Sequence, residues 1–410
     1  MQSITEIPIL KDRRVILGVT GSIAAYKAVD LASKLSQAGA EVDVILSASA
    51  RQFVTPITFK SVTGRDAYTE EDLWGPEAHV LHVGLAEDAD VYAIAPATAH
   101  TIAKLASGEA DTLLTLAALA SRAPLLIAPA MDVGMYENAA TQANIDTLRS
   151  RGATIAGPAE GRMASGLVGL GRMVEPDELI GHIRVLLGKS GPLAGRRVVV
   201  TAGGTQEPLD PVRVIANRSS GKQGFALAQA AVDRGAMVAL IAAPSHESTP
   251  IGVRRIDVET AAQMKEASVG AVTDADVLLM AAAVADFRPV DAPDQKIKRG
   301  EGVPEVKLEP TDDILASVAA QRRETRFPHV IVGFAAESQS LVENAGRKLR
   351  DKGIDLIVAN DISSDDAGFS VDTNRVVIID SENVVEELPL MTKTAVAEHV
   401  LDRVVKIIEK

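Results

Sequence analysis

The stretch RVVVTAGGTQEPLDPVRVIANRSSGKQGF, Arg197–Phe225, decides the fold of the chain. It opens with an apolar run, Val198–Thr201, that is typical of a buried strand, and the pair Gly203-Gly204 follows. A long polar loop then leads through Ser219–Lys222 into an alanine-rich segment with helical spacing. Strand, glycine turn and helix start form the usual beginning of an α/β domain that binds a phosphate-bearing ligand. Because this beginning comes almost halfway along 410 residues, we expect a complete domain before it.

The composition indicates a globular protein with aliphatic cores. Hydrophobic residues make up 47% of the chain and aromatic residues only 3%, so Ala, Val, Leu and Ile must fill the interior. The net charge of −13 argues against nucleic acid as the main partner. Cysteine is absent, which excludes disulfides and thiolate metal sites. We see neither a signal-peptide pattern nor an apolar run of the roughly 20 residues that span a bilayer, and we expect a soluble, cytoplasmic protein.

The residues before the opening stretch show the same alternation of strands and helices. We expect the first strand at Arg14–Thr20 and the first helix at Ile23–Ala38, with Ser22 able to cap the helix and an anion favoured at its start. Every doubly wound domain begins in this way, so the turn alone leaves phosphate binding open. Loops after the expected strands Asp90–Ala95 and Leu125–Pro129 lie where ligands bind in open parallel sheets.

Two histidines and a glycine-rich segment stand out in this first half. His79 and His82 are three residues apart on a segment with helical spacing, Ala78–Ala86. They could be metal ligands, but no third ligand is evident nearby, and surface or capping histidines are the alternative. The segment Gly157–Met173, rich in Gly, Met and Ser, is expected to be a loop that acts as a movable flap.

A linker rich in Pro and Gly, residues 188–195, separates the two halves, because the strand–helix alternation restarts after it. We therefore divide the chain into domains at residues 1–187 and 196–410. Each is expected to be a doubly wound, three-layer α/β domain with a mostly parallel sheet. The second is expected to end in a hairpin and a closing helix at Thr392–Ile408.

Polar loops follow several expected strands of the second half. They carry the cations and carboxylates Arg213, Lys222, Asp286, Lys296, Lys298, Arg299, Lys348, Lys352 and Asp361. Converging cations in an acidic protein suggest a polyanionic ligand such as a triphosphate, and Asp286 or Asp361 could help to hold Mg²⁺. Any one of these lysines could equally be a solvated surface residue. No Walker A sequence is present, which excludes a P-loop ATPase.

Taken in order, these motifs resemble the bacterial bifunctional phosphopantothenoylcysteine decarboxylase/phosphopantothenate–cysteine ligase family of coenzyme A biosynthesis. In the first half the resemblance rests on GVTGSIAAYK (Gly18–Lys27), HVGLA (His82–Ala86), APAT (Ala95–Thr98), PAM (Pro129–Met131) and GLGRM (Gly169–Met173). In the second it rests on TAGGTQEPLDPVR (Thr201–Arg213), NRSSGKQG (Asn217–Gly224), AAAVADF (Ala281–Phe287), KIKR (Lys296–Arg299), GFAAE (Gly333–Glu337) and AND (Ala359–Asp361). Each motif alone is weak, whereas their order and spacing over nearly the whole chain are specific.

The resemblance implies a fold and an assembly. The first domain would be a flavodoxin-like, FMN-binding domain that forms trimers with flavin sites between protomers. The second would be a Rossmann-like ligase domain that dimerises. Together the two contacts would give a homo-oligomer, expected to be a dodecamer.

For the second domain, the resemblance implies ligation of 4′-phosphopantothenate with L-cysteine, driven by CTP and Mg²⁺ through an acyl-cytidylate. Both steps build negative charge that fixed cations and amide dipoles stabilise. Lys296 would be needed to form the acyl-cytidylate, and Asn217 would be needed for the acyl-cytidylate to react further. Arg213 would lie in the substrate site. The implied nucleotide contacts are Ser219, Ser220, Gly221, Lys222, Asp286, Phe287, Lys296, Phe334, Lys348 and Lys352.

For the first domain, the resemblance implies FMN-dependent decarboxylation of the ligase product to 4′-phosphopantetheine. The flavin would oxidise the cysteine thiol carbon to a thioaldehyde, which accepts electrons as CO₂ leaves, and would then return a hydride. His82 matches the family's active-site histidine. The implied FMN contacts are Gly21, Ser22, Ser47, Ala97, Thr98 and Met131.

Two positions depart from the family pattern. Asp132 stands where an asparagine often binds the substrate carboxylate, and it would repel that group unless it is protonated or turned away. Ser165 takes the catalytic position of a flap cysteine implicated in the final reduction, and serine is a much weaker acid than a thiol. We still expect full turnover, with the proton delivered from elsewhere.

Two other functions remain to be weighed. The first domain could be a flavin-binding regulator without turnover, joined to an active ligase. A nicotinamide dehydrogenase with two Rossmann units is disfavoured, because no GxGxxG follows either first strand.

Overall fold

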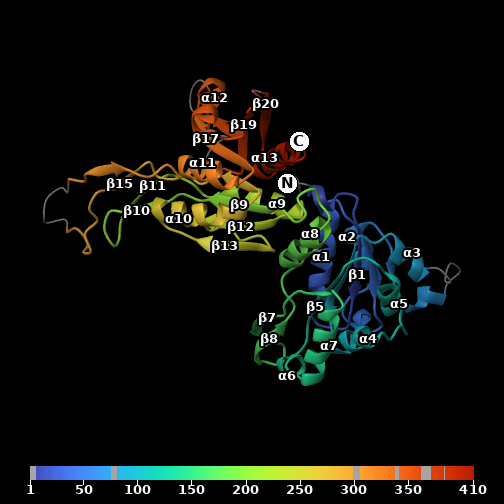
Figure 1. The fold of residues 1–410 in the computed structure, drawn as a ribbon. Helices are drawn as coiled ribbons and strands as arrows, with labels where there is room; N and C mark the ends of the chain where they lie inside the picture. Colours follow the sequence, from blue (N-terminus) through green and yellow to red (C-terminus); the bar gives the residue numbers. More distant parts are fainter. Residues whose placement is uncertain (1–5, 75–80, 299–304, 338–340, 362–370, 383) are drawn as a thin grey trace. The chain divides into compact units, whose positions relative to one another are not determined.

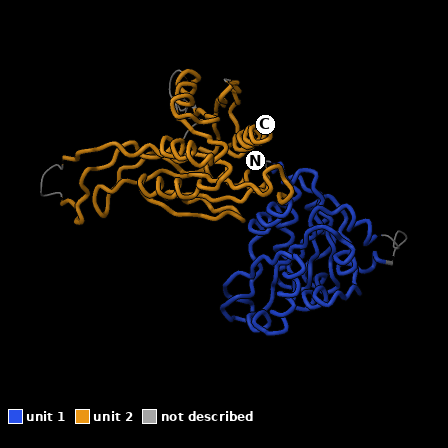
Figure 2. The backbone as a smooth tube through the Cα atoms, viewed as in Figure 1, with its two compact units in different colours: residues 1–187 blue, residues 188–410 orange. Residues whose placement is uncertain are grey.

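A computed structural model describes residues 6–74, 81–298, 305–337, 341–361, 371–382 and 384–410. The chain divides into two compact units, Met1–Leu187 and Gly188–Lys410 (Figure 2). Each unit is an α/β domain with its own sheet (Figure 1). In the described part of the chain, no helix is long and apolar enough to cross a membrane.

The first unit is built on a parallel sheet with the order β3-β2-β1-β4-β5-β6. Its strands are β1 Arg14–Val19, β2 Glu41–Leu46, β3 Ala67–Tyr68, β4 Val91–Ala97, β5 Leu125–Pro129 and β6 Thr154–Ile155. Its helices are α1 Ala25–Gln37, α2 Pro56–Thr63, α3 Leu81–Glu87, α4 Ala99–Ser107, α5 Leu113–Ala120, α6 Val133–Tyr136, α7 Ala139–Ser150 and α8 Pro176–Gly188.

Both faces of this sheet are buried, because alternate residues of a strand point to opposite faces. Val15 and Leu17 of β1 pack in a cluster with α1 and α8, whereas Ile16 packs in a second cluster with α4, α5 and α7. The expected three-layer class is therefore confirmed. The strand order 3-2-1-4-5-6 differs from the order 2-1-3-4-5 of flavodoxin itself, so the likeness to flavodoxin lies in the layers and the parallel sheet.

The second unit contains a larger sheet with the order β13-β12-β9-β14-β17-β18-β19-β20. Its strands are β9 Arg197–Ala202, β12 Met237–Ala242, β13 Val253–Asp257, β14 Val277–Met280, β17 Val330–Glu337, β18 Leu356–Asp361, β19 Thr373–Asp380 and β20 Val385–Thr392. The strands from β13 to β18 are parallel, and β19 and β20 are antiparallel. Its helices are α9 Lys222–Asp233, α10 Ala261–Ala271, α11 Ile314–Thr325, α12 Leu341–Lys352 and α13 Lys393–Ile408. The expected Rossmann-like core, terminal hairpin and closing helix are present.

Two short antiparallel ribbons extend from this sheet (Figure 1). One pairs β10 (Gln206–Pro208) with β11 (Val214–Ala216), and the other pairs β15 (Phe287–Pro289) with β16 (Leu308–Pro310). The sequence suggested only a polar loop between Gly204 and Ser219. That interpretation was wrong, because strands this short and interrupted by Pro leave no clear alternation of apolar residues.

Two other segments differ from their expected structure. Gly157–Met173, expected to be a loop, folds into a hairpin of β7 (Ala159–Arg162) and β8 (Val168–Arg172). Residues 188–195, expected to be a linker, belong to the second unit. Leu193 there is fully buried, and its N–H donates to the carbonyl of Arg234 at 2.8 Å.

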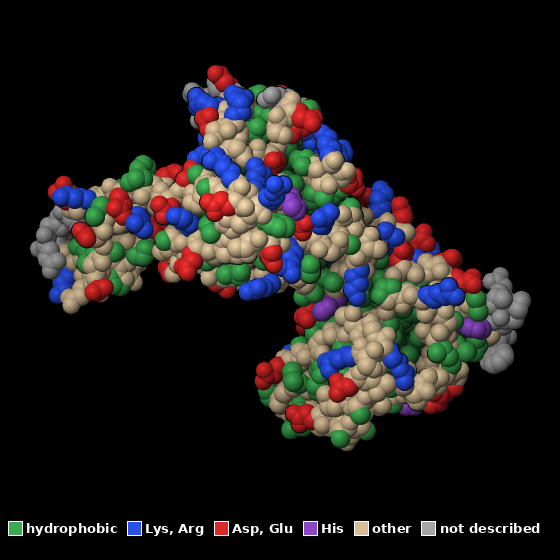
Figure 3. All heavy atoms as spheres, viewed as in Figure 1, with side chains coloured by type: hydrophobic (Ala, Val, Ile, Leu, Met, Phe, Trp, Pro, Cys, Tyr) green, Lys and Arg blue, Asp and Glu red, His purple; other side chains and the backbone are tan. Residues whose placement is uncertain are grey.

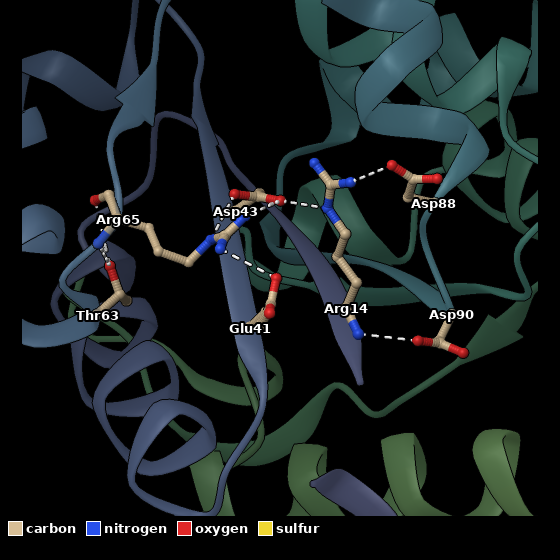
Figure 4. A network of polar contacts seen from close by, with 7 residues as sticks. All are labelled: Arg14, Glu41, Asp43, Thr63, Arg65, Asp88 and Asp90. Atoms are coloured by element: carbon tan, nitrogen blue, oxygen red, sulfur yellow. Dashed lines mark hydrogen bonds and ion pairs between the residues drawn. The ribbon is translucent and has the colours of Figure 1, made fainter. Parts of the chain in front are cut away.

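A buried ion-pair network fixes the first two strands at their amino-terminal ends (Figure 4). The carboxylate of Asp43 on β2 is 1% exposed and accepts from Arg14 Nε at 2.6 Å and from Arg65 Nε at 2.9 Å. The backbone N–H of Arg14 donates to Asp90 at 2.8 Å. These bonds hold β1 in register with its neighbours, so that the loops at the opposite, carboxyl ends are presented side by side.

Candidate active sites

Thr20 joins two loops at the point where the strand order of the first sheet reverses, between β1 and β4. Its hydroxyl donates to the carbonyl of Pro96 at 2.7 Å and accepts from the N–H of Thr98 at 3.1 Å. Thr20 is 1% exposed, so water does not compete for these bonds. The loops after β1 and β4 are therefore fixed together at the edge where doubly wound sheets bind ligands.

The predicted flavin contacts lie on adjacent loops at this edge. A Cβ on Gly21 would stand 2.3 Å from the Cβ of Ser49, so only glycine lets the loops after β1 and β2 approach so closely. Ser22 does not cap α1 as expected: the helix begins later, and the Ser22 hydroxyl accepts from the N–H of Ala24 at 3.2 Å.

The other predicted contacts on these loops also supply hydroxyl groups. The Ser47 hydroxyl, after β2, accepts from Ala50 N–H at 3.2 Å, and Thr98, after β4, caps α4. The chemistry of Ser22, Ser47 and Thr98, three partly buried hydroxyl groups on loops at one sheet edge, fits a phosphate-bearing flavin.

His82 lies on α3, which packs against α5. Its Nδ1 is buried and has no hydrogen-bond partner within the described residues, so it is ready to accept a hydrogen bond or a proton from a ligand. His79 lies outside the described residues. The described part of the chain contains no group of three His, Cys, Asp or Glu residues arranged to hold a metal ion.

The two positions that depart from the family pattern contact each other. Asp132 is the N-cap of α6, and its Oδ1 accepts from the N–H of Gly134 at 3.2 Å. Its Oδ2 accepts from the hydroxyl of Ser165 at 2.5 Å. The preceding residue, Met131, donates its N–H to the carbonyl of Gly171 at 3.0 Å, which ties this loop to the β7–β8 hairpin. Both oxygens of the Asp132 carboxylate are thus engaged within the protein.

A cavity of about 590 Å³ lies at the reversal point of the second sheet, between β9 and β14. Backbone and side-chain bonds join the loops that follow these strands. The N–H of Ala283 donates to Gly203 at 2.8 Å, and the hydroxyl of the fully buried Thr205 accepts from the N–H of Ala285 at 2.9 Å. The cavity is therefore formed by a fixed edge of the sheet.

The start of α9 forms one wall of this cavity. Gly221 is its N-cap with φ of 83°, a left-handed conformation that favours glycine. A Cβ on Gly224 would stand 2.5 Å from the Cβ of Ala202, so α9 packs closely on β9. Ser219 and Ser220 precede the helix and direct their hydroxyls to its first N–H groups, at 3.3 and 3.5 Å. The helix dipole makes this wall attractive to an anion.

Most of the predicted nucleotide contacts line this cavity. They are Ser219, Ser220, Gly221, Lys222, Asp286, Phe334, Lys348 and Lys352. Asn217 lines it as well and donates its side-chain N–H to the carbonyl of Val284 at 2.9 Å. An ion pair with Asp372 at 2.5 Å raises the pKa of Lys222, and Lys352 is ion-paired with Asp313. The cavity wall therefore combines lysines, two of which are held in place by ion pairs, with an anion-attracting helix start.

Arg213, Lys296 and Phe287 do not line this cavity in their own chain. Arg213 follows β10, and its guanidinium forms an ion pair with Asp210 and donates to the carbonyl of Ile297 at 3.2 Å. Asp210 also accepts from the N–H of Ile297 at 3.2 Å, and the Arg213 guanidinium holds the pKa of its carboxyl well below the usual range. Asp210 thus brings the segments of Arg213 and Lys296 together on the ribbons. Phe287, on β15, is 54% exposed.

Comparison with known proteins shows to which family the chain belongs. The Flavoprotein family model matches residues 6–188, and the model for the DNA/pantothenate metabolism flavoprotein C-terminal domain matches residues 193–408. The coenzyme A biosynthesis bifunctional protein CoaBC of Bacillus subtilis (strain 168) is 42% identical over 96% of this chain and 97% of its own length. The chain belongs to the bifunctional coenzyme A biosynthesis family. The relative from Mycobacterium tuberculosis (strain ATCC 25618 / H37Rv) is 43% identical over 96% of each chain.

The bifunctional coenzyme A biosynthesis family also includes solved structures. A crystal structure of the C-terminal domain of a CoaBC protein is 37% identical, covers 54% of this chain and 99% of its own, and has a TM-score of 0.45. Membership in the family confirms the resemblance seen in the sequence, including the flavoprotein character of the first unit.

Sequence reasoning missed several residues of these sites. Asn374 and Lys393 belong to no motif and line the cavity only through the fold. Asp210 lies within the motif Thr201–Arg213, but its contact with the segment of Lys296 follows only from the fold. The sequence signal that could have found Asp210 is its place three positions before Arg213, which allows the two side chains to form an ion pair.

Proposed function

We propose that the protein makes 4′-phosphopantetheine in two steps. The second unit ligates 4′-phosphopantothenate with L-cysteine at the expense of CTP through an acyl-cytidylate. The first unit then decarboxylates the product with FMN. Near full-length relatives named coenzyme A biosynthesis bifunctional protein support this assignment of two activities. The observation that carries the ligase assignment is the cavity at the start of α9, which has the size for a nucleoside triphosphate and is lined by four lysines and a helix start.

In the ligase unit, the chain's own residues would bind and orient two anionic substrates. The first-turn N–H groups of α9, with Lys222, would hold the phosphates, and Lys348 and Lys352 would neutralise further negative charge. Asn217, fixed by its bond to Val284, would face the acyl carbon. Asp286, which lines the cavity, is the candidate Mg²⁺ ligand, and the phosphates of CTP would supply further oxygen ligands.

The ribbons would complete this site by dimerisation of the second unit. They expose apolar side chains, with Val212 64%, Val214 44% and Phe287 54% exposed, and Figure 3 shows hydrophobic atoms on this part of the surface. Exposed apolar clusters mark protein interfaces. A ribbon-mediated dimer would bury them and place Arg213 and Lys296 at the interface.

In the decarboxylase unit, FMN supplies the two-electron oxidation and re-reduction when it is bound. Thr20 fixes the two loops that would receive it, and hydroxyls of Ser22, Ser47 and Thr98 would bind its phosphate. His82 would hold a proton at its unpartnered Nδ1. Met131 and Asp132 would form the loop on the substrate side.

Assembly of the first unit would also bury apolar surface. Ile23 and Tyr26, beside the flavin loops at the start of α1, are each 63% exposed, and Leu119 is 65% exposed. A trimer through this unit would cover such residues and place the flavin between protomers. Trimer contacts and dimer contacts together would build the expected dodecamer.

One experiment tests both steps. The purified protein is incubated with 4′-phosphopantothenate, L-cysteine, Mg²⁺ and either CTP or ATP, and the products are followed by mass. We expect pyrophosphate, CO₂ and 4′-phosphopantetheine with CTP. Ligation without CO₂ release, also from supplied phosphopantothenoylcysteine, would favour the alternative in which the first unit binds flavin without turnover. Asp132 and Ser165 are the observations behind that alternative. No ligation with either nucleotide would refute the ligase assignment.

A further inference from the structure

Two asparagines on neighbouring strands, Asn360 of β18 and Asn374 of β19, line the cavity of the second unit. Asn360 lies opposite Val376 in the antiparallel pair, and Asn374 stands two positions before Val376. Every second residue of a strand points to the same face of a sheet, so both asparagines lie on one face. Asn374 is 5% exposed. We call these two residues the asparagine corner of the cavity.

Hydrogen bonds to Gln223 of α9 fix the orientation of the Asn374 amide. The side-chain N–H of Gln223 donates to the backbone carbonyl of Lys393 at 3.1 Å, and a carbonyl can only accept. The side-chain oxygen of Gln223 therefore faces Asn374, whose amide N–H donates to it at 3.3 Å. This chain of bonds excludes a flipped amide, so the oxygen of Asn374 is the atom that points away from Gln223.

The side-chain oxygens of both asparagines are buried, and neither has a hydrogen-bond partner among the described residues. Buried acceptors are normally paired, and an unpaired one costs about 1–3 kcal/mol. Ser268 and Gln321 of the same unit also hold a buried oxygen that no described residue binds, but neither of them lines the cavity. The asparagine corner thus calls for a ligand that donates two hydrogen bonds.

The place of the asparagine corner narrows the class of donor. Gln223 belongs to the first turn of α9, whose N–H groups attract phosphates. Ionised phosphate oxygens only accept hydrogen bonds, so they cannot satisfy the two asparagine oxygens. In the ligation, the donor that must come beside a phosphate is the amine of L-cysteine, because it attacks the carbon joined to the phosphate in the acyl-cytidylate. The ribose hydroxyls are also donors, but the 5′ carbon separates the ribose ring from that phosphate.

We propose that Asn360 and Asn374 bind the amine of L-cysteine. The proposal rests on the ligase function proposed above and adds the position of its second substrate. A neutral amine has two N–H donors and one lone pair, so two acceptors hold it and leave the lone pair free to attack. The nitrogen forms a bond to the acyl carbon, the bond from that carbon to CMP breaks with its electron pair leaving on CMP, and one amine proton passes to water. The amide product keeps a single N–H, so it loses one of the two hydrogen bonds and is released more easily.

The test compares four variants of the full-length protein. N360L and N374L keep the approximate shape of asparagine and remove its oxygen, whereas N360D keeps an acceptor. Q321M is the matched control, because it removes a buried oxygen that lies away from the cavity. The first measurement is the rate of pyrophosphate release from 4′-phosphopantothenate and CTP without cysteine. The second is the KM for L-cysteine in the complete ligation.

We expect the two leucine variants to lose cysteine binding and keep the first half of the reaction. N360L and N374L should each raise the KM for L-cysteine about 3- to 10-fold, the effect of one lost hydrogen bond. Their pyrophosphate release should stay within about twofold of wild type, and Q321M should match wild type in both measurements. N360D should keep the KM within about threefold, since a carboxylate also accepts from an amine.

A wild-type KM for L-cysteine in N360L and N374L overturns the proposal. Slow pyrophosphate release in these variants overturns it as well, because the oxygens would then serve the nucleotide or the shape of the cavity. Asn374 also binds Gln223, so the Asn360 variants decide the matter if N374L does not fold. Wild-type protein that releases no pyrophosphate from 4′-phosphopantothenate and CTP would instead refute the ligase function itself.

Discussion

Replacement of Gly224 by alanine should separate nucleotide binding from decarboxylation. The added Cβ would stand 2.5 Å from the Cβ of Ala202 and 2.9 Å from the carbonyl oxygen of Thr201, both on β9. Ordinary contacts begin at 3.4 Å, so the start of α9 must retreat from the sheet by about 1 Å. Overpacking of this kind typically costs about 1–3 kcal/mol in the free energy of unfolding. The same shift moves the first-turn N–H groups that face the cavity.

Gly270 supplies the matched control within the same unit. It lies in the last turn of α10, and a Cβ there would meet nothing within 4 Å. G270A should therefore stabilise the unit by roughly 0.5–1 kcal/mol, because alanine loses less backbone entropy than glycine in a helix. The two substitutions add the same methyl group and differ only in the space available.

Calorimetry measures both variants. Unfolding of a chain with two units is not a single two-state event, so the transition of the second unit is identified as the one that CTP shifts upward. G224A should lower that transition and raise the KM for CTP by tenfold or more, with decarboxylation of supplied phosphopantothenoylcysteine unchanged. G270A should raise the transition and leave both activities intact. A G224A protein with a wild-type transition and a wild-type KM would refute the close-packing argument.

Three further predictions concern other parts of the chain. N217A should abolish ligation and spare decarboxylation of supplied substrate; loss of both activities would contradict independent sites. T20V removes the hydroxyl that bonds Pro96 and Thr98, which should lower the stability of the first unit by about 1–3 kcal/mol and increase flavin release, measured by fluorescence, whereas T20S should behave as wild type. The Arg213 guanidinium lowers the pKa of Asp210 in the folded protein, so the Asp210 carboxylate stabilises the ribbons fully at pH values above the ordinary Asp pKa near 4. This stabilisation is lost only when the pH falls through the lowered pKa of the folded state. D210N should therefore make residues 206–216 sensitive to limited proteolysis at neutral pH, and equal sensitivity of wild type and variant there would exclude this role.

The sequence predicted the parts of the fold that long periodic segments determine. The strand Leu125–Pro129 has the bounds that were expected, and the closing helix, α13, differs from its expected bounds by one residue, because a buried strand and an amphipathic helix each extend over several residues. The ribbons and the β7–β8 hairpin were missed, since their pairs of short strands are stabilised by each other and show little local preference.

For the candidate sites, the sequence motifs predicted which loops carry the site residues, but not which side chains contact one another. The sequence placed Lys222 and Lys352 near one ligand, and both line the cavity. It treated Asp132 and Ser165 as separate departures, whereas the fold joins them by a hydrogen bond across 33 positions of sequence. Lys393 was invisible, because its burial beside Lys222 follows from the packing of α13 on α9, a contact between the two ends of the second unit.

That packing has a consequence for how the protein is made. Asn374 and Lys393 belong to β19 and α13, which are synthesised after α9 and β9, whereas the whole first unit is synthesised before β9 begins. Domains fold as units in the order of their synthesis. The flavin site can therefore form on the nascent chain while the nucleotide cavity still lacks a wall. A chain truncated before α13 would keep an intact first unit and leave uncovered the face of α9 that packs on α13, so such a truncation would abolish the first reaction of the pair and spare the second.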